Sequence, residues 1–286
     1  MAIRSILVPL TGRGDLAGPM QMALGLGKRF GATVEVRYVA PDPRLTLPYM
    51  GEGISPGLVE SLMEAMEKED AARRAAARTA AEQACKSVGV VIATGAASSG
   101  FSVTFADLRG DAAGTIGRVG RLSDLIVLAR PAEEAPEEDD IAQAAVMESG
   151  RPVLLVPPGG ASLPDRRVLV AWNGSREAAR ALSTALPFMQ GGEFAEVVTV
   201  GELSEDQPTA AEAAISLVRH EVKAEGKVLP DTGDKVSEVL LREAHAMRCD
   251  LVVMGAYTHS RVRELVLGGV TRYVLSDAGI PVLLIH

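Results

Sequence analysis

Short runs of apolar residues alternate along this chain with longer segments in which apolar positions recur at helical spacing. This alternation is typical of βαβ units, in which parallel strands lie buried beneath helices. The order of the runs occurs twice, and three pairs of segments match between the halves: 6–12 with 168–174, 124–128 with 250–254, and 151–156 with 280–285. A repeat of this length corresponds to a small domain, so the pattern predicts two copies of one fold.

Five strands and four helices are expected in the first half of the chain. The strands are at residues 5–9, 33–39, 103–105, 125–129 and 153–156. The helices are at residues 16–30, 58–88, 112–120 and 141–147. Residues 42–57, between the second strand and the long helix, carry repeated Pro and Gly, which indicates an irregular insertion.

The second half repeats this order with less insertion. Its strands are expected at residues 168–172, 196–200, 227–229, 251–254 and 282–285. Its helices are expected at residues 176–189, 210–225, 236–247 and 270–276. The linker is predicted at residues 157–162, because its paired Pro followed by paired Gly stop the strand and cannot continue the sheet.

The predicted fold class is α/β, with two tandem Rossmann-like domains, each doubly wound. Each domain has a five-stranded, mainly parallel sheet flanked by helices. The first domain covers residues 1–158 and contains an insertion at 42–66, and the second covers residues 165–286. The fifth strand of such a sheet presents a free edge, which favours pairing between the copies within one chain, and a homodimer through the same edge stays open.

Composition narrows the class of protein. Hydrophobic residues make up 47% of the chain but aromatic residues only 3%, which fits a core of small aliphatic side chains beneath helices. A net charge of −8 disfavours a nucleic-acid partner, and no apolar stretch approaches the ~18 residues that a membrane span needs. The apolar run near the N-terminus is too short for a signal peptide, and Cys85 and Cys249 suit unpaired intracellular thiols. We therefore expect a soluble, cytoplasmic protein.

The loop after the predicted fourth strand of the second half is the main candidate site. Doubly wound sheets bind ligands at the carboxyl ends of their strands, where the winding direction switches. Here Gly255 ends the strand, and Gly268 and Gly269 directly precede a predicted helix. Such glycines let backbone amides approach an anion, although they serve equally well as turn residues. The same loop carries three further groups that either meet a phosphate or are solvated: His259, Arg261 and Arg263.

With these features the chain resembles the tandem form of the universal stress proteins over essentially its whole length. The resemblance rests on Asn173-Gly174-Ser175 after the first strand, the glycine loop, and the closing segment 278–284. It implies a regulatory or sensor protein of the stress response that binds ATP or another adenine nucleotide, such as AMP, and needs no metal.

The family's ATP motif is only partly kept in this chain. Family members that bind ATP have Gly, two residues, Gly, nine residues, Gly, and then Ser or Thr. This chain keeps Gly255 and Gly268 at that spacing but has Thr258 for the middle glycine and Gly269 for the final hydroxyl residue. Asn173 stands where the family has Asp. The contacts that the resemblance implies are Ala171, Asn173, Val200, Gly255, Thr258, Gly268, Gly269, Val270 and Thr271.

The first half lacks this glycine loop. Its fourth strand is followed by Arg130 and Pro131, and Pro131 has no amide hydrogen to donate to a phosphate. The acidic residues of 133–140 follow at the place where phosphates would lie, and otherwise form a solvated loop before the next helix. We therefore predict that the first copy has no phosphate site of this kind.

No pattern for catalysis or metal binding emerges. The histidines show no metal-ligand spacing, and no Ser has a partnered His at a readable spacing. Because no residue qualifies as a general base for water, we expect a binding protein and not an enzyme, with a slow ATPase left as a weaker alternative. The alternative from another class is a non-nucleotide interaction protein that uses residues 42–66, the long helix and the fifth-strand edges.

Overall fold

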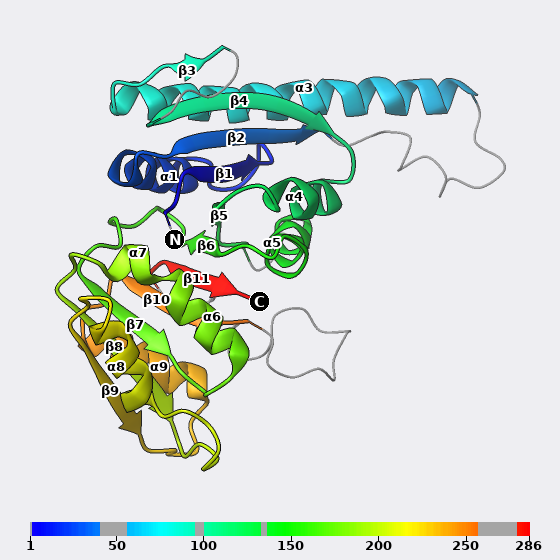
Figure 1. The fold of residues 1–286 in the computed structure, drawn as a ribbon. Coiled ribbons are helices and arrows are strands. Elements are labelled where there is room, and N and C mark those ends of the chain that lie inside the picture. Colours follow the sequence, from blue (N-terminus) through cyan, green and yellow to red (C-terminus); the bar gives the residue numbers. More distant parts are fainter. Residues whose placement is uncertain (1, 41–55, 95–99, 133–135, 257–278) are drawn as a thin grey trace.

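The computed structural model describes residues 2–40, 56–94, 100–132, 136–256 and 279–286 (Figure 1). The strands of this part form one 11-stranded sheet, in the order β3-β4-β2-β1-β5-β6-β11-β10-β7-β8-β9. The first six belong to the first copy and the other five to the second. Two doubly wound α/β units therefore share one continuous sheet.

The first copy is a parallel sheet with helices on both faces. Its strands are β1 (Ser5–Leu10), β2 (Thr33–Ala40), β3 (Ile92–Ala93), β4 (Ser102–Arg109), β5 (Leu125–Ala129) and β6 (Val153–Val156). Its helices are α1 (Ala17–Phe30), α3 (Pro56–Ser87), α4 (Ala112–Gly120) and α5 (Pro136–Glu148). Ile6 and Val8 of β1 contribute to the core beneath α1, whereas Leu7 contributes to the core on the opposite face. Burial on both faces explains why the strands read as nearly unbroken apolar runs.

The second copy has the same winding. Its strands are β7 (Arg167–Ala171), β8 (Phe194–Val200), β9 (Ala224–Leu229), β10 (Leu251–Gly255) and β11 (Val282–Ile285). Its helices are α6 (Arg176–Thr184), α7 (Leu186–Met189), α8 (Ala210–Val218) and α9 (Val236–Ala246). None of the helices in the described ranges is long and apolar enough to cross a membrane.

The two copies are joined through β6 and β11, the last strand of each copy, which correspond to the predicted fifth strands. β6 and β11 pair antiparallel, with Leu154 opposite Leu283, which confirms the predicted pairing between copies. Side chains extend this junction. Arg29 donates from Nη1 to the Pro164 carbonyl at 2.7 Å. The rings of Phe30 and Phe188 pack edge to face, with 5.6 Å between their centroids. Because each fifth-strand edge is used inside the chain, these edges do not supply the free surface that the interaction hypothesis assumed.

Several predicted element bounds were wrong, and local chemistry explains them. The helix expected at 176–189 is divided at Ala185, and Pro187, which has no amide hydrogen, lies in the first turn of α7. The helix expected at 210–225 ends at Val218, because the chain turns at Glu221 with φ of 63° and then enters β9.

The first copy also departs from the prediction at its edge and in α5. β4 pairs with β2 over eight residues where three were expected, and the two-residue β3 lies outside β4. Helix α5 begins before the expected residue 141, so Glu137, Glu138 and Asp139 lie within its first turn, where negative charge favours the helix dipole. The helix predicted at 270–276 falls outside the described residues.

Candidate functional site

Four of the nine predicted contact residues lie in the described part of the chain, and three of them end neighbouring strands. Ala171 ends β7, Val200 ends β8 and Gly255 ends β10. In the register of the sheet, Ala171 lies opposite Met254 on one side and Val198 on the other. β7 and β10 are the strands between which the winding switches, so the structure brings these residues to the expected edge. The other five, Thr258, Gly268, Gly269, Val270 and Thr271, lie outside the described residues, as do His259, Arg261 and Arg263.

Asn173 holds the turn between β7 and α6. Its side-chain oxygen accepts hydrogen bonds from the Ser175 amide at 3.2 Å and from the Ser175 hydroxyl at 2.6 Å. Ser175 Oγ in turn accepts from the Ala178 amide at 3.1 Å and caps the helix, while Gly174 takes a positive φ of 71°. The positive end of the α6 dipole is thereby fixed at the switch point, where it favours an anion. An aspartate at position 173 could accept the same two hydrogen bonds.

Gly255 is required by packing at this edge, whatever it binds. A Cβ at this position would lie 2.7 Å from the Glu177 carbonyl carbon and 2.8 Å from the Ala178 amide nitrogen. The first turn of α6 therefore approaches the end of β10 more closely than any other residue type permits. Close packing is thus a third reason for a glycine at position 255, besides the turn and the phosphate contact considered from the sequence.

Trp172 packs against a loop. The side chain is buried, and Nε1 donates to the Pro208 carbonyl at 2.7 Å. The Trp172 carbonyl accepts from Thr199 Oγ1 at 2.9 Å. With its indole nitrogen engaged, Trp172 fixes the loop before α8 against the end of β7.

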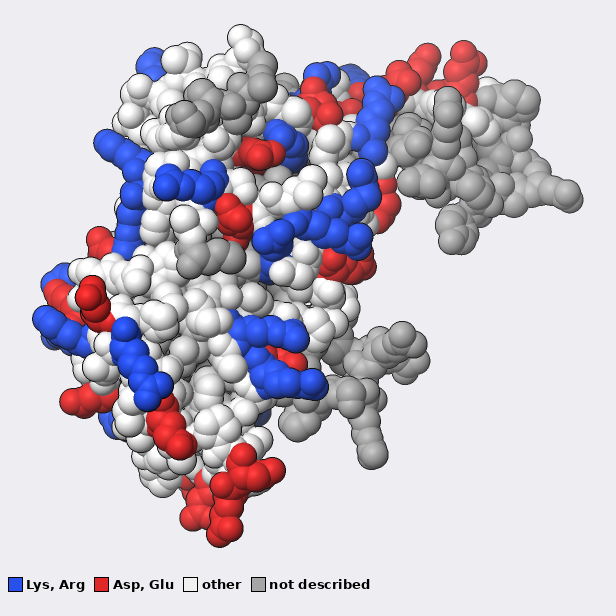
Figure 2. Space-filling model, in the orientation of Figure 1, with Lys and Arg blue, Asp and Glu red and all other residues white. Residues whose placement is uncertain are grey.

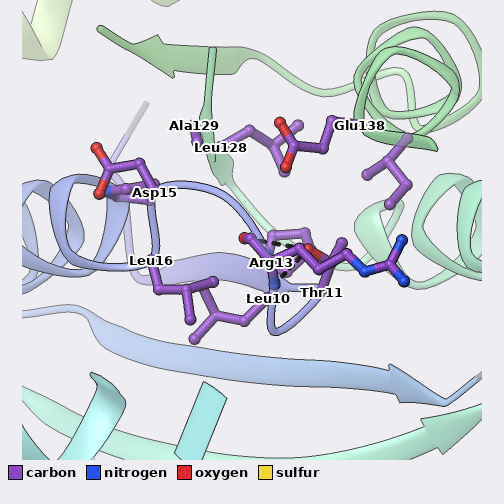
Figure 3. A pocket seen from close by; sticks show the side chains of 11 residues that line it. Leu10, Thr11, Arg13, Asp15, Leu16, Leu128, Ala129 and Glu138 are labelled. Atoms are coloured by element: carbon purple, nitrogen blue, oxygen red, sulfur yellow. Dashed lines mark hydrogen bonds between the residues drawn. The ribbon is translucent and has the colours of Figure 1, made fainter. Parts of the chain in front are cut away.

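The corresponding edge of the first copy contains a small cavity (Figure 3). It lies at the carboxyl ends of β1 and β5 and has a volume of about 30 Å³. Such a space holds roughly two water molecules, far less than a nucleotide requires. Its lining residues are Pro9, Leu10, Thr11, Arg13, Asp15, Leu16, Pro19, Leu128, Ala129, Glu138 and Ile141.

Two carboxylates occupy the place where an anionic ligand would lie in this first copy. Asp15 accepts from the amides of Ala17 and Gly18 at 3.0 and 2.9 Å, so it already fills the N-terminus of α1. Burial raises the pKa of the Glu138 carboxyl above its usual range; a backbone hydrogen bond from Ala132 opposes this, and neighbouring acids including Asp15 add to it. The acidic segment predicted Glu138, whereas Asp15 was missed, although it follows the end of the first strand in a short Gly- and Arg-containing stretch.

The remaining chemistry of the described residues is sparse. No group of three or more His, Cys, Asp and Glu within the described ranges is placed to hold a metal ion. Cys85 and Cys249 are free and buried, and burial raises the pKa of both thiols, that of Cys249 to about 12. Basic and acidic side chains are interspersed on the face shown in Figure 2, and its described part carries no continuous basic stripe.

Comparison of the sequence with known proteins gives a match to a family model and a match to one curated relative, each over part of the chain. The model of the universal stress protein family matches residues 165–286. A universal stress protein of Synechocystis sp. is 31% identical over 125 residues, which are 41% of this chain and 41% of that relative. The match therefore spans less than half of the length of this curated relative.

Solved structures resemble the chain over nearly its full length. A universal stress protein from Archaeoglobus fulgidus gives a TM-score of 0.68 at 17% identity and covers 98% of this chain and 97% of its own. A functionally unknown protein from Pseudomonas aeruginosa gives a TM-score of 0.56 at 12% identity, with 99% and 92% covered. At these identities the likeness shows the fold, which is the predicted tandem α/β arrangement.

Proposed function

We propose that this chain, whose residues 165–286 match the universal stress protein family, is a regulatory protein that binds an adenine nucleotide in its second copy. The binding position is the carboxyl edge of β7 and β10, where Ala171 and Gly255 end their strands and Asn173 follows β7. The nucleotide is ATP or AMP, and the protein acts by binding it and not by turning it over.

The difference between the two switch points is the observation that carries this proposal. In the first copy, the small cavity is lined by Asp15 and Glu138, two carboxylates that repel phosphate. At the switch point of the second copy, the described residues supply the Asn173 amide side chain, Gly255 and the N-terminus of α6. Electrostatics therefore favours an anion in the second copy and opposes one in the first.

Calorimetric titration of the intact chain with ATP and with AMP tests the proposal. We expect one site per chain, and we expect Gly268→Trp to abolish binding while the urea unfolding curve stays unchanged. Asn173→Asp retains the hydrogen bonds of the turn and serves as the matched variant at the site, and it should still bind. No heat with millimolar ATP, or unchanged affinity in Gly268→Trp, would overturn the assignment.

The second candidate function is protein interaction without a nucleotide. It is favoured by the first half of α3, where Leu58 is 60% exposed and no side chain between residues 57 and 68 is fully buried. The fifth-strand edges no longer support it, because β6 and β11 pair with each other. A chain that binds no nucleotide and loses a cellular partner on deletion of residues 42–66 would favour this function.

A further inference from the structure

The middle of helix α3 lies beside the carboxyl ends of adjacent strands in the first copy. Leu10, Tyr38 and Asp107 lie side by side in the register of β1, β2 and β4. The Tyr38 hydroxyl donates to Asp70 Oδ1 of α3 at 2.6 Å, and Asp107 forms an ion pair with Arg74 of α3. The middle of α3 is therefore tied to the edge at which the switch point lies.

The backbone of α3 also lies directly on the loop after β1. Gly12 has a positive φ of 75°, and a Cβ there would overlap the carbonyl group of Arg73. Contact this close leaves no room for a ligand between the loop and the helix.

Four side chains of alternating charge form a closed ring at this contact, which we call the ion-pair ring: Arg13, Glu69, Arg73 and Glu137. Arg13 pairs with Glu69 and lies 3.7 Å from Glu137. Arg73 lies 2.8 Å from Glu69 and 3.7 Å from Glu137. Each arginine therefore contacts both glutamates, and the ring joins the loop after β1, the middle of α3 and the first turn of α5.

The ring is placed where α3 leaves the sheet. Toward its C-terminus the helix is anchored by buried side chains, among them Ala77, Ala81 and Cys85. Toward its N-terminus no fully buried side chain lies between residues 57 and 68, and the helix extends past the strands (Figure 1). The ring and its neighbours Asp70 and Arg74 thus make the last described hydrogen bonds and ion pairs between the helix and the rest of the first copy.

Burial within the ring is uneven, which makes it sensitive to salt. Arg73 is 16% exposed, whereas Arg13, Glu69 and Glu137 are 50%, 55% and 44% exposed. Ion pairs this exposed are weakened as the Debye length falls from about 30 Å at 0.01 M to about 3 Å at 1 M salt.

The second copy has no counterpart of this contact among the described residues. The helix that follows β8 is α8, which has nine residues where α3 has 32. It starts at a capping box formed by Thr209 and Glu212, with no projecting segment before it. Among the described residues, a helix held in this way therefore occurs in the first copy and not in the second.

We propose that the ion-pair ring is a salt-sensitive closure that holds α3 against the loop after β1 in the first copy. While the ring is intact, residues 69–74 stay against the loop after β1, and raised ionic strength loosens this contact while the Tyr38–Asp70 hydrogen bond remains. The closure does not depend on nucleotide binding in the second copy, so it stands or falls separately from that function.

Hydrogen–deuterium exchange of the full chain, followed by mass spectrometry, tests this closure. In the unmodified protein, amides in residues 69–74 should exchange about fivefold faster at about 1 M than at about 0.01 M salt. Peptides from α4, whose residues take part in none of the ion pairs described above, serve as the internal reference for general effects of salt. This comparison uses only the unmodified protein, so it tests the proposal even if a variant fails to fold.

Two variants separate the ring from charges elsewhere on the helix. Arg13→Gln breaks two contacts of the ring and should give fast exchange at both salt concentrations. Glu82→Gln removes the pair with Arg78 on the same helix, outside the ring, and should behave as the unmodified protein. Exchange in residues 69–74 that is independent of salt, or that is as slow in Arg13→Gln as in the unmodified chain, would overturn the proposal.

Discussion

Gly255→Ala should destabilise the second copy even though it adds one methyl group. The new Cβ would meet Glu177 and Ala178 at 2.7 to 2.9 Å, whereas ordinary van der Waals contact begins at 3.4 Å. The overlap with the nearest atom is therefore 3.4 − 2.7 = 0.7 Å, and it falls on helix backbone that cannot rotate away. Overpacking of this kind costs about 1–3 kcal/mol of unfolding free energy.

Urea denaturation followed by circular dichroism measures this cost. Gly57→Ala is the matched control, because nothing lies within 4 Å of a Cβ at Gly57 and the residue is on the exposed start of α3. Its stability should stay unchanged or rise slightly, since alanine favours a helix. If Gly255→Ala unfolds within about 0.5 kcal/mol of the parent chain, the packing argument is refuted. Weakened nucleotide binding in this variant would then report a contact with the ligand.

Three further outcomes follow from buried groups. Burial raises the pKa of Glu138 above its usual range, so the folded state loses stability as pH rises through that pKa. Glu138→Gln should therefore be more stable than the parent at pH 7.5. In urea titrations this difference in unfolding free energy should shrink toward pH 4.5. Cys85 and Cys249 are buried with raised pKa values and should resist iodoacetamide at pH 8 until urea is added, as mass spectrometry would reveal; rapid labelling of the native chain would contradict this burial. Arg29→Met removes a charged hydrogen bond to the Pro164 carbonyl at the junction and should cost about 1–3 kcal/mol, whereas an unchanged urea midpoint would show that this hydrogen bond does not stabilise the junction.

Strands buried on both faces were the elements that sequence predicted best. β5, β6 and β11 have the expected bounds, because a strand covered on both sides carries no polar residue to obscure its limits. The half-exposed β4 was predicted too short, since its outward side chains break the apolar run. The end of α8 was missed because the residues after Val218 suit a helix locally, and pairing with β8 draws residues 224–226 into the strand that was expected only at 227–229.

The candidate site was predictable in position but not in detail. Asn173 and Gly255 were identified from the pattern, yet the closeness of α6 that requires glycine at 255 depends on tertiary packing. The ion-pair ring left no signal, because Arg13, Glu69 and Glu137 are distant in sequence and individually resemble solvated surface charges. These side chains form ion pairs only because the fold brings the loop after β1, α3 and α5 together.

Native mass spectrometry of the intact chain with excess ATP tests the central claim most directly. The account predicts one bound nucleotide per chain, retained by Arg13→Gln and lost in Gly268→Trp. No bound nucleotide would contradict the regulatory function proposed for the second copy. Two bound nucleotides would contradict the exclusion of the ligand from the first.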